Sequence, residues 1–350
     1  MTDTFIFRSE ALVAAVHTIV AAAGSHEEEA AAVAANLVEA NLRGHDSHGV
    51  IRIAQYVTSM EKGTTKPTPT IRVLNETPTT AVIDGDQGFG QVVARRGMEL
   101  AIEKARAQGL AAVALANTNH VGRLADYVEL AARQGMIGLM WVNAPLALGV
   151  APWGGAARRL ATNPHAVGVP GRSGTAMLLD FATSVVAEGK LRVKFNRKEQ
   201  APPGWMLDGE GHPSTDPQKY YAEPRGSLLP MGEHKGYGLA LAVEVLAGIL
   251  SGTGAASAKV GPVRNGTLMV VIDVRRFLPL EAFSRQVEDL FTWVKSAPLV
   301  ENSKGILIPG EPEARTEADR RANGIYIEDE TWAQIQAAEK GSARPSPFQG

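Results

Sequence analysis

The stretch LAAVALANTNHVGRLADYVELAARQGMIGLMWV, residues 110–142, decides the class of fold. Its two ends, Leu110–Ala116 and Met136–Val142, are continuous apolar runs, which are typical of strands buried on both faces. The segment between them, Arg123–Gln134, has the spacing of an amphipathic helix and is followed by Gly135. Strand, helix and strand with short connections predict a βαβ-like unit.

Strands and helices are also predicted on both sides of this stretch. Residues Thr80–Asp84 predict a strand, and Gln91–Gln108 predicts a helix that is closed by a glycine. Further along the chain, the pattern predicts two more strands and a long apolar helix, at Ala176–Phe181, Leu268–Asp273 and Leu239–Leu250. Most of the chain therefore alternates strands with helices.

The N-terminal segment has a different pattern. Residues 8–23 and 26–42 are alanine-rich and predict two helices, and Ser25 with Glu28 has the spacing of a capping box for the second. Another short helical stretch is predicted after residue 52. The Pro/Thr-rich sequence GTTKPTPT at 63–70 is the best candidate for a domain boundary.

The composition limits the class of protein. The chain has 350 residues, and its 35 basic and 37 acidic side chains leave a formal charge of −2, which gives no chain-wide electrostatic case for nucleic acid or an anionic membrane. Cysteine is absent, so thiolate catalysis, disulfides and metal–thiolate sites are excluded. No apolar run approaches the ~20 residues of a membrane span, and MTDTFIFRSE has no signal-peptide pattern. We expect a cytoplasmic protein.

The standard nucleotide-binding loops are weak or missing. Gly88-Phe89-Gly90 follows a predicted strand and opens a helix, but Val93 stands where a dinucleotide fingerprint has glycine or alanine. The sequence contains no Walker A motif, which excludes P-loop phosphoryl chemistry, and no GxSxG elbow, which argues against an α/β-hydrolase.

Three polar residues, His45, Asp46 and His48, lie within four positions and allow three interpretations. They could ligate a metal ion, since two histidines and a carboxylate are a possible ligand set. They could be a solvated helix terminus. Alternatively, His48 could be an acid/base with Arg52 one helical turn later as the binding group for an anion, because a spacing of four puts both side chains on one face.

A second histidine, His120, follows the predicted strand Leu110–Ala116 directly and precedes the helix expected from about Gly122. Ligands of open α/β sheets bind outside the carboxyl ends of strands. A helix start would also favour the neutral imidazole, which can accept a proton. The alternative is that His120 only caps the turn.

Lys235 lies between glycines, just before the predicted apolar helix. A lysine at a helix start opposes the helix macrodipole, so its presence there suits a site for an anion such as a cofactor phosphate. The alternative is a flexible surface lysine. Pro309-Gly310-Glu311, after the apolar run Gly305–Ile308, indicates on its own only a turn after a strand.

Taken together, these segments resemble the malate/L-lactate dehydrogenase family that lacks a Rossmann fold, whose members include ureidoglycolate and sulfolactate dehydrogenases, diketogulonate reductase and cyclic-imine carboxylate reductases. The resemblance extends over nearly the whole chain. The matching stretches are LRGHDSHGVIR (42–52), IDGDQGFGQ (83–91), ANTNHVGRLADY (116–127), APWGG (151–155), ATNPHAVGVP (161–170), LDFATSVVAEGK (179–190), LLPMGEHKGYGLAL (228–241) and IPGEP (308–312).

The resemblance implies roles for individual residues. It makes His48, with Ser47 beside it, or His120 the proton donor or acceptor, and it makes Arg52 the group that holds the substrate carboxylate. We expect His120 to make the direct proton transfer and His48 to orient or relay through Ser47. The cofactor is NAD or NADP, no metal is expected, and the implied cofactor contacts are Thr162, Asp180, Phe181, Ala182, Lys235, Gly310 and Glu311.

The chain departs from the family pattern at three places. Val142-Asn143-Ala144 replaces a Thr-Asn-Ser sequence, which removes a serine contact to the cofactor. His45 stands where valine or isoleucine is common. Arg123 stands where many members have a small residue, and it could be a second cation that binds substrate or only a surface charge.

The resemblance also implies an architecture and an activity. The expected fold class is α+β, with a non-Rossmann nicotinamide-binding domain around a mixed sheet at 76–311 and an all-helical domain built from 1–75 and 312–350. A homodimer is expected, with no nucleic acid or membrane as partner. The expected activity is hydride transfer between NAD(P)H and a small 2-oxo acid. The alternatives are a cyclic 2-imino acid reductase, a ureidoglycolate-type dehydrogenase, a metal-dependent hydrolase or lyase that uses His45, Asp46 and His48, and a non-catalytic cofactor sensor.

Overall fold

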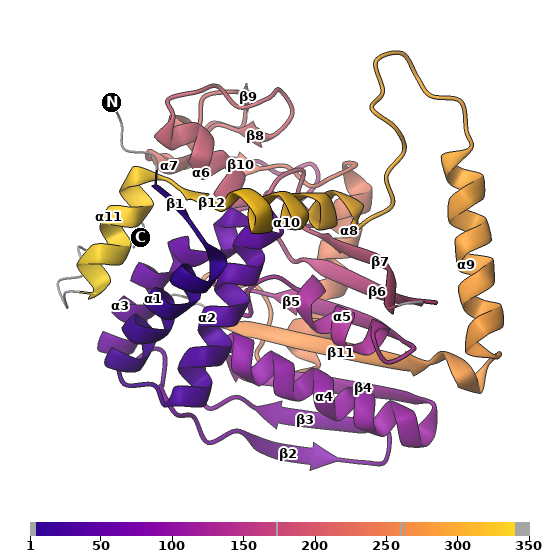
Figure 1. The fold of residues 1–350 in the computed structure, drawn as a ribbon. Helices are drawn as coiled ribbons and strands as arrows, with labels where there is room; N and C mark the ends of the chain where they lie inside the picture. Colours follow the sequence, from indigo (N-terminus) through magenta and orange to yellow (C-terminus); the bar gives the residue numbers. More distant parts are fainter. Residues whose placement is uncertain (1–4, 173, 260, 263, 340–350) are drawn as a thin grey trace.

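The computed structural model describes residues 5–172, 174–259, 261–262 and 264–339, and its largest element is a seven-stranded sheet (Figure 1). The strand order is β2-β3-β4-β11-β5-β6-β7. Of these strands, β3 and β4 form the one parallel pair of neighbours. The sheet is therefore mixed, as predicted. Its strands are Arg72–Glu76 (β2), Thr80–Asp84 (β3), Leu110–Thr118 (β4), Met136–Asn143 (β5), His165–Gly171 (β6), Gly174–Phe181 (β7) and Asn265–Asp273 (β11).

The strand β11 splits the predicted βαβ-like unit. β4 and β5 both form where the apolar runs predict them, with helix α5 (Ala125–Ala132) between them in the chain. In the sheet, however, β11 lies between β4 and β5 and is antiparallel to both. A buried strand has unpaired backbone N–H and C=O groups on both of its edges. Its composition does not show which other strand will pair with each edge.

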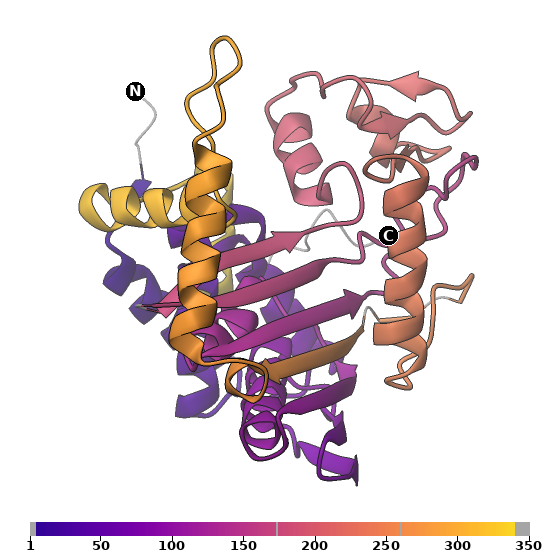
Figure 2. The same ribbon diagram turned by 90° about the vertical axis from the view of Figure 1, so that its right-hand side faces the viewer.

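The main core lies between the sheet and two helices, α4 (Gly90–Gln108) and α5. Fully buried side chains from both layers meet there, among them Met98 of α4 and Met140 of β5. Two helices stand on the opposite side of the sheet (Figure 2). One is α8 (His234–Val243), which continues as the π-helix η3 (Glu244–Ile249) and therefore begins five residues before the predicted start. The other, α9 (Leu280–Lys295), was not predicted.

A second apolar cluster joins the two ends of the described chain. The strand β1 pairs antiparallel with β12, and side chains of α1, α2, α3 and α11 pack together. The elements are Phe5–Phe7 (β1), Ser9–Ala22 (α1), Glu27–Leu42 (α2), Ile53–Glu61 (α3), Glu311–Asn323 (α10), Ile325–Ile327 (β12) and Asp329–Glu339 (α11). The first two helices match the predicted ranges to within one residue. The division into a helical domain of residues 1–75 and 312–350 and a second domain of residues 76–311 stays a prediction. Residues 1–4 and 340–350 of the helical domain lie outside the described ranges.

Two local expectations were wrong. The N-cap of α2 is His26, so Ser25 lies one position too early to cap the helix, and its buried hydroxyl makes no hydrogen bond. Residues 305–308 form no strand, because a single backbone bond, from Leu178 N to Pro309 O, joins this segment to the free edge of β7.

A third, smaller part of the molecule covers one end of the sheet. It contains α6 (Glu188–Asn196), a small sheet with the order β10-β8-β9, and α7 (Gln218–Tyr221) around its own apolar cluster. The small strands are Met206–Leu207 (β8), Pro213–Ser214 (β9) and Ser227–Leu228 (β10). None of the helices within the described ranges has the length and apolar character that crossing a bilayer requires.

Candidate active site

Three candidate site residues lie in the short helices that follow α2. His48 ends the short helix η1 (Asp46–His48), Arg52 ends η2 (Val50–Arg52), and Tyr56 lies in the first turns of α3. The spacing of four does not place His48 and Arg52 on one face of an α-helix as predicted, because η1 and η2 are 3₁₀ helices and the backbone of Gly49 between them is extended. The charge of Arg52 nevertheless acts on the pKa values of both His48 and Tyr56, so the three side chains lie close together. The sequence pattern predicts His48 and Arg52, but not Tyr56, as site residues.

His120 reaches the same place from the end of β4. The chain leaves the strand through Asn117, which has a φ of +52°, and His120 lies in the connection before α5. Gly90, at the start of α4, packs directly on this connection, and a Cβ at Gly90 would lie 2.3 Å from the carbonyl oxygen of His120. The second glycine of the Gly-Phe-Gly sequence therefore serves close packing between backbones.

The two histidines face each other and are held by hydrogen bonds. Their ring centroids lie 5.5 Å apart with the ring planes 23° from parallel. The hydroxyl of Tyr56 lies 2.8 Å from Nδ1 of His120 and accepts a hydrogen bond of 2.7 Å from Nε2 of Gln91. A hydroxyl oxygen has two lone pairs, so that of Tyr56 can accept a bond from Gln91 and a second from Nδ1–H of His120. In that tautomer, Nε2 of the neutral imidazole is unprotonated and can accept a proton.

Both imidazoles are held in the neutral form. Burial lowers the pKa of His48 to about 3, and the charge of Arg52 acts in the same direction. The pKa of His120 is lowered well below its ordinary value, mainly by burial and to a smaller extent by the charge of Arg52. The expected effect of a helix start is replaced by burial, because His120 lies five residues before α5 and a helix dipole acts over about one turn. Burial also raises the pKa of Tyr56 to about 12.

Arg52 is positioned to hold an anion beside this pair. Its Nε donates to the carbonyl oxygen of Ser47 over 2.7 Å, and one terminal nitrogen donates to Gln55 over 3.0 Å. The other terminal nitrogen has no hydrogen bond to any described residue. Ser47 also places its hydroxyl 3.0 Å from Nδ1 of His48. Gly189 packs on Ser47, where a Cβ would lie 2.4 Å from that of the serine.

The three residues of the metal hypothesis point to different partners. His45 lies 3.4 Å from Glu313 of α10, and Asp46 is paired with both terminal nitrogens of Arg320 at 2.6 and 3.1 Å. His48 is turned to Ser47. Among the described residues, no three histidine or acidic side chains are grouped as metal ligands. A metal-dependent hydrolase or lyase built on these three residues is therefore not supported.

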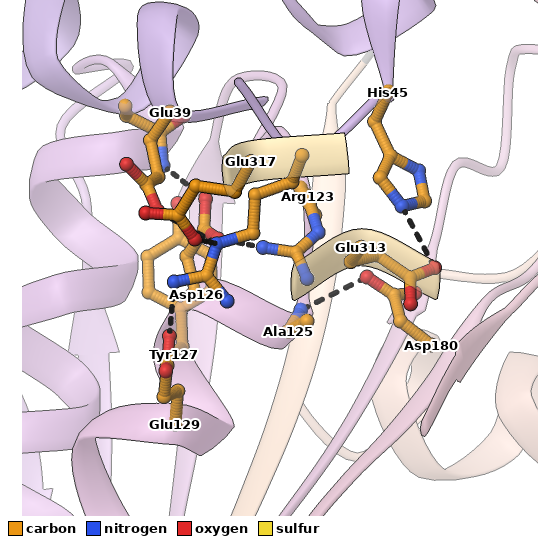
Figure 3. Close-up of polar contacts among 12 residues, drawn as sticks. Glu39, His45, Arg123, Ala125, Asp126, Tyr127, Glu129, Asp180, Glu313 and Glu317 are labelled. Carbon is orange, nitrogen blue, oxygen red and sulfur yellow. Dashed lines mark hydrogen bonds and ion pairs between the residues drawn. The ribbon is translucent and has the colours of Figure 1, made fainter. Parts of the chain in front are cut away.

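Arg123 is buried rather than on the surface, so its interpretation as surface charge is wrong. Its side chain is 2% exposed and forms an ion pair of 2.5 Å with Asp126 (Figure 3). Its Nε has no partner. Burial raises the pKa of Asp126 to about 6, against the opposing charge of Arg123. Arg123 is also near enough to His48 and Asp180 for its charge to act on both of their pKa values.

The strand β7 ends with Asp180 and Phe181, and Asp180 lies near enough to Arg123 for that charge to act on its pKa. A carboxylate oxygen of Asp180 accepts a hydrogen bond of 2.9 Å from the backbone nitrogen of Ala125, at the start of α5 (Figure 3). Burial raises the pKa of this carboxyl. Phe181 lies opposite His165 of β6, with ring centroids 5.7 Å apart, and His165 stacks on Trp141 of β5 at 5.0 Å.

Thr162, Ala182 and Lys235 are brought together through Thr183. The carbonyl oxygen of Thr162 accepts hydrogen bonds of 2.8 and 2.9 Å from the backbone nitrogen and hydroxyl of Thr183, the residue after Ala182. The carbonyl oxygen of Thr183 in turn accepts a bond from Met231 N, in the turn that leads to Lys235. Lys235 lies in the first turn of α8, is exposed, and makes no side-chain hydrogen bond or ion pair to any described residue.

Gly310 and Glu311 start α10 beside β7. Gly310 has a φ of +101° and packs against Leu178, which excludes most other residues there. The carboxylate of Glu311 pairs with Lys295 at the end of α9 and accepts a bond of 2.9 Å from Ile308 N. These contacts lower the pKa of Glu311, with the bond to Lys295 as the first cause.

The comparisons with known proteins agree with this geometry. The family model described as "Malate/L-lactate dehydrogenase" matches residues 7–336. The chain belongs to this family. It is 37% identical to hydroxycarboxylate dehydrogenase B of Escherichia coli (strain K12), over 97% of this chain and 95% of that protein. It is 40% identical to malate dehydrogenase of Pyrococcus abyssi, over 87% and 86%. The solved structure of sulfolactate dehydrogenase from Methanocaldococcus jannaschii superposes with a TM-score of 0.88 at 37% identity, covering 97% of each chain.

The structure adds three candidate site residues to those predicted from the sequence. Tyr56 and Gln91 form the hydrogen-bonded chain behind His120, and His165 lies between two aromatic rings with its Nδ1 buried and unpartnered. A signal for Tyr56 was present, since it continues the four-residue spacing of His48 and Arg52. No comparable local signal exists for Gln91, whose partner lies 35 positions away.

Proposed function

We propose that the protein is an NAD(P)-dependent dehydrogenase that interconverts a small 2-hydroxy acid and its 2-oxo acid. The observation that carries this proposal is the pair of facing, neutral histidines beside Arg52, which has a free guanidinium nitrogen. A cofactor sensor would need no acid/base pair next to an anion-binding group. Membership of a dehydrogenase family supports the same activity.

Arg52 begins the sequence of events by binding the substrate carboxylate. A planar guanidinium can hold a carboxylate through two parallel hydrogen bonds, which a lysine could not do. The bound carboxylate also offsets the charge of Arg52, one of the causes that lower the pKa of both histidines. Substrate binding therefore raises the proton affinity of the site at the moment when a proton is needed.

His120 handles the proton at the substrate's C2 oxygen. In the oxidation direction, Nε2 of the neutral imidazole accepts the hydroxyl proton and the ring becomes an imidazolium. In the reduction direction, His120 first takes up a proton from solvent, and the imidazolium then donates it from Nε2 to the developing oxyanion and returns to the neutral form. Tyr56 keeps the other nitrogen, Nδ1, hydrogen-bonded and so aligns the ring. His48, fixed by Ser47, orients the substrate from the opposite side. A bound nicotinamide supplies or accepts the hydride.

The residues around the end of β7 fit a nicotinamide cofactor. Lys235 is an exposed, unpaired cation at a helix start, which suits phosphate. A Cβ at Gly238, in the first turns of α8, would meet nothing within 4 Å, so a ligand could approach the backbone there. The buried, unpartnered Nδ1 of His165 beside Phe181 leaves a polar atom free for a ligand group. Thr162, Ala182 and Gly310-Glu311 would complete this site.

Arg123 directs the substrate preference toward anionic 2-oxo acids. Among the described residues, Arg123 forms its ion pair with Asp126, its Nε has no hydrogen-bond partner, and its charge acts on the pKa of His48. We therefore expect dicarboxylates such as oxaloacetate to be preferred over pyruvate. The double variant Arg123→Leu/Asp126→Leu removes the pair without leaving a buried charge, and it should narrow that preference. An unchanged ratio of rates for the two substrates would remove Arg123 from the substrate site.

The wider architecture completes the proposal. A helical domain of residues 1–75 and 312–350 would close over a non-Rossmann cofactor-binding domain of residues 76–311, so that His48 and Arg52 come from one domain and His120 from the other. A homodimer in the cytoplasm is the proposed state of the protein.

A steady-state assay of nicotinamide absorbance tests this function. The panel contains 2-oxo acids and cyclic 2-imino acids, each with NADH and NADPH, and a control repeated after chelation. We expect turnover of a 2-oxo acid that chelation leaves unchanged. Turnover of a cyclic imino acid alone would move the protein to that alternative, and cofactor binding without turnover on the whole panel would mean a sensor.

A further inference from the structure

The connection that carries His120 is held on both sides by the start of β11. Asn119, the residue before the histidine, accepts a hydrogen bond of 2.7 Å at its Oδ1 from a terminal nitrogen of Arg264. Val121, the residue after it, donates its backbone N–H to Oδ1 of Asn265 over 3.1 Å. Asn265 is the first residue of β11 and Arg264 precedes it. Two consecutive residues therefore hold the two neighbours of the histidine.

An irregular register between β4 and β11 turns the chain just before this connection. Asn265 pairs with Thr118 of β4. Two residues later in β11, Thr267 pairs with Leu115, which lies three residues earlier in β4, so β4 has one residue more than β11 between the two pairs. Asn117, within this stretch, has a φ of +52°. A bulge of this kind bends the strand and changes the direction of the residues that follow.

The side-chain amide of Asn265 has one favourable orientation. The residue is 4% exposed, and while its Oδ1 accepts from Val121 N, its Nδ2 donates to the carbonyl oxygen of Asn143, at the end of β5, over 3.0 Å. Rotating the amide by 180° would place its NH₂ group against the N–H of Val121 and its oxygen against a carbonyl oxygen. Both contacts would leave buried polar groups unpaired. The place of the acceptor for Val121 is therefore fixed.

Buried groups also fix Asn143, on which Asn265 rests. Its Oδ1 accepts a bond of 3.1 Å from Gly266 N, and its Nδ2 donates to Oε2 of Glu244 over 3.0 Å and to the carbonyl oxygen of Gly254 over 2.9 Å. Glu244, in the π-helix η3, is 4% exposed, and Asn143 is fully buried. Hydrogen-bonded networks in a buried setting are rigid when their members are paired. Asn265 is thus held by the interior of the molecule.

Arg264 supports the other side of the connection. Besides its bond to Asn119, the half-buried guanidinium donates over 2.8 Å to the carbonyl oxygen of Thr64 and over 2.8 Å to Oε1 of Gln87. A guanidinium is planar and has several donors in fixed directions, so it can hold these acceptors in one arrangement. Its partners come from the segment after α3, the turn before α4 and the His120 connection. Arg264 therefore joins three segments at one point.

We propose that Arg264 and Asn265 are positioning residues, which hold His120 where its Nε2 exchanges a proton with the substrate. Tyr56 aligns the ring through Nδ1, whereas these two residues fix the backbone on either side of it. The inference rests on the proposed function, because that function assigns the proton transfer to His120. A displacement of about 1 Å at a reacting group can lower a rate by about a hundredfold. Loss of one support should therefore reduce turnover.

Two variants and a matched control test this role. Asn265→Ala should lower the turnover of a 2-oxo acid by about ten- to hundredfold and leave the cofactor's Michaelis constant unchanged. Asp273→Ala is the control, because Asp273 ends the same strand, is 3% exposed against 4%, and accepts a bond from Arg275 N. It should lower the melting temperature as Asn265→Ala does, but keep the turnover. If Asn265→Ala fails to fold, Arg264→Leu decides, with an expected fall of about tenfold.

A double-mutant comparison separates positioning from stability. In a His120→Ala background, Asn265→Ala should lower the residual turnover by less than about twofold, because no histidine is left to position. The full loss in that background, or unchanged turnover in the single variants, would overturn the inference.

Hydrogen exchange of the Val121 amide gives a measurement independent of activity. The exchange should be faster in Asn265→Ala than in Asp273→Ala, because only the first variant removes the acceptor of this N–H. Equal exchange in the two variants would overturn the inference even if the enzyme is active. Absence of turnover of any 2-oxo acid by the unmodified protein would instead contradict the proposed function, and the exchange would still decide whether Asn265 holds the connection.

Discussion

The histidine end of the proposed site, at His48 and His120, and its proposed cofactor end, at Lys235 and Glu311, are built in opposite ways. His48 and Tyr56 come from one segment and His120 from another. Tyr56 holds the ring of His120 through Nδ1, Ser47 lies at hydrogen-bond distance from Nδ1 of His48, and the two imidazoles face each other. Lys235 is exposed at a helix start without a side-chain partner, and Glu311 is tied to an exposed helix. Proton transfer depends on fixed geometry and shifted pKa values, so that end is preorganised. A phosphate group needs an accessible cation, so the other end is open.

The largest expected effect comes from breaking the histidine end. His120→Ala should lower turnover by ~10²–10⁴-fold while the cofactor still binds, because a positioned acid/base contributes that much to the rate. One limb of the pH–rate profile should disappear. His48→Ala should act less on turnover and more on the substrate's Michaelis constant. If His48→Ala abolishes turnover and His120→Ala keeps both limbs, the two roles are reversed.

Breaking the cofactor end should change binding instead of turnover. Lys235→Ala should raise the cofactor's Michaelis constant by roughly ten- to hundredfold, since a charged hydrogen bond is worth about 1.5–3 kcal/mol. The melting temperature should stay the same, because the side chain has no bond to the described residues. Lys198→Ala, at another exposed lysine, is the control. A cofactor constant equal to that of the control would remove Lys235 from the phosphate site.

The dependence of stability on pH should also differ between the histidine end and the cofactor end. His48 has a folded pKa of about 3, below the ~6.5 of an unfolded histidine, so unfolding takes up a proton as the pH falls below about 6.5. Its contribution to stability is present above that pH and is lost on acidification, by up to about 1.4 kcal/mol per pH unit. His48→Gln should therefore lose less stability than the unmodified protein between pH 7 and 5 in urea unfolding.

Carboxyls of the same region act in the opposite direction. The folded pKa of Asp126 is raised to about 6, so protonation of this buried group favours the folded state as the pH falls. The contribution of His48 is therefore the difference between the pH dependence of unfolding free energy in the unmodified protein and in His48→Gln. Lys235→Ala, at the open end, should show the slope of the unmodified protein. Equal slopes for His48→Gln and the unmodified protein would mean that His48 is protonated in the folded state.

The smallest expected effect concerns the hydroxyl of Tyr56. Tyr56→Phe keeps the ring and removes the hydrogen bond to Nδ1 of His120, which is worth about 0.5–1.5 kcal/mol. Turnover should fall by roughly two- to twelvefold, with a shifted pH–rate profile and an unchanged cofactor constant. A purely structural role would instead lower the melting temperature and leave the pH profile in place.

The sequence by itself determined the features that depend on short spacing. Apolar periodicity located α1, α2, β4 and β5, because helices and buried strands select residues at fixed local intervals. The order of short motifs identified the family. The spacing of four between His48 and Arg52 led to the right pair of residues, although they lie in two short 3₁₀ helices and not on one α-helix. The helix α9 is also amphipathic, so the same periodicity indicates it.

Tertiary structure alone decided which distant segments meet. β11 entered between β4 and β5, Tyr56 met His120 across 64 positions, and Asp180 met the start of α5 across 55. Burial, rather than a helix start, set the pKa of His120, and the ion pair with Asp126 turned Arg123 inward. These contacts form because three apolar clusters pack the chain as a whole. A local sequence pattern cannot show which distant residues this packing brings together.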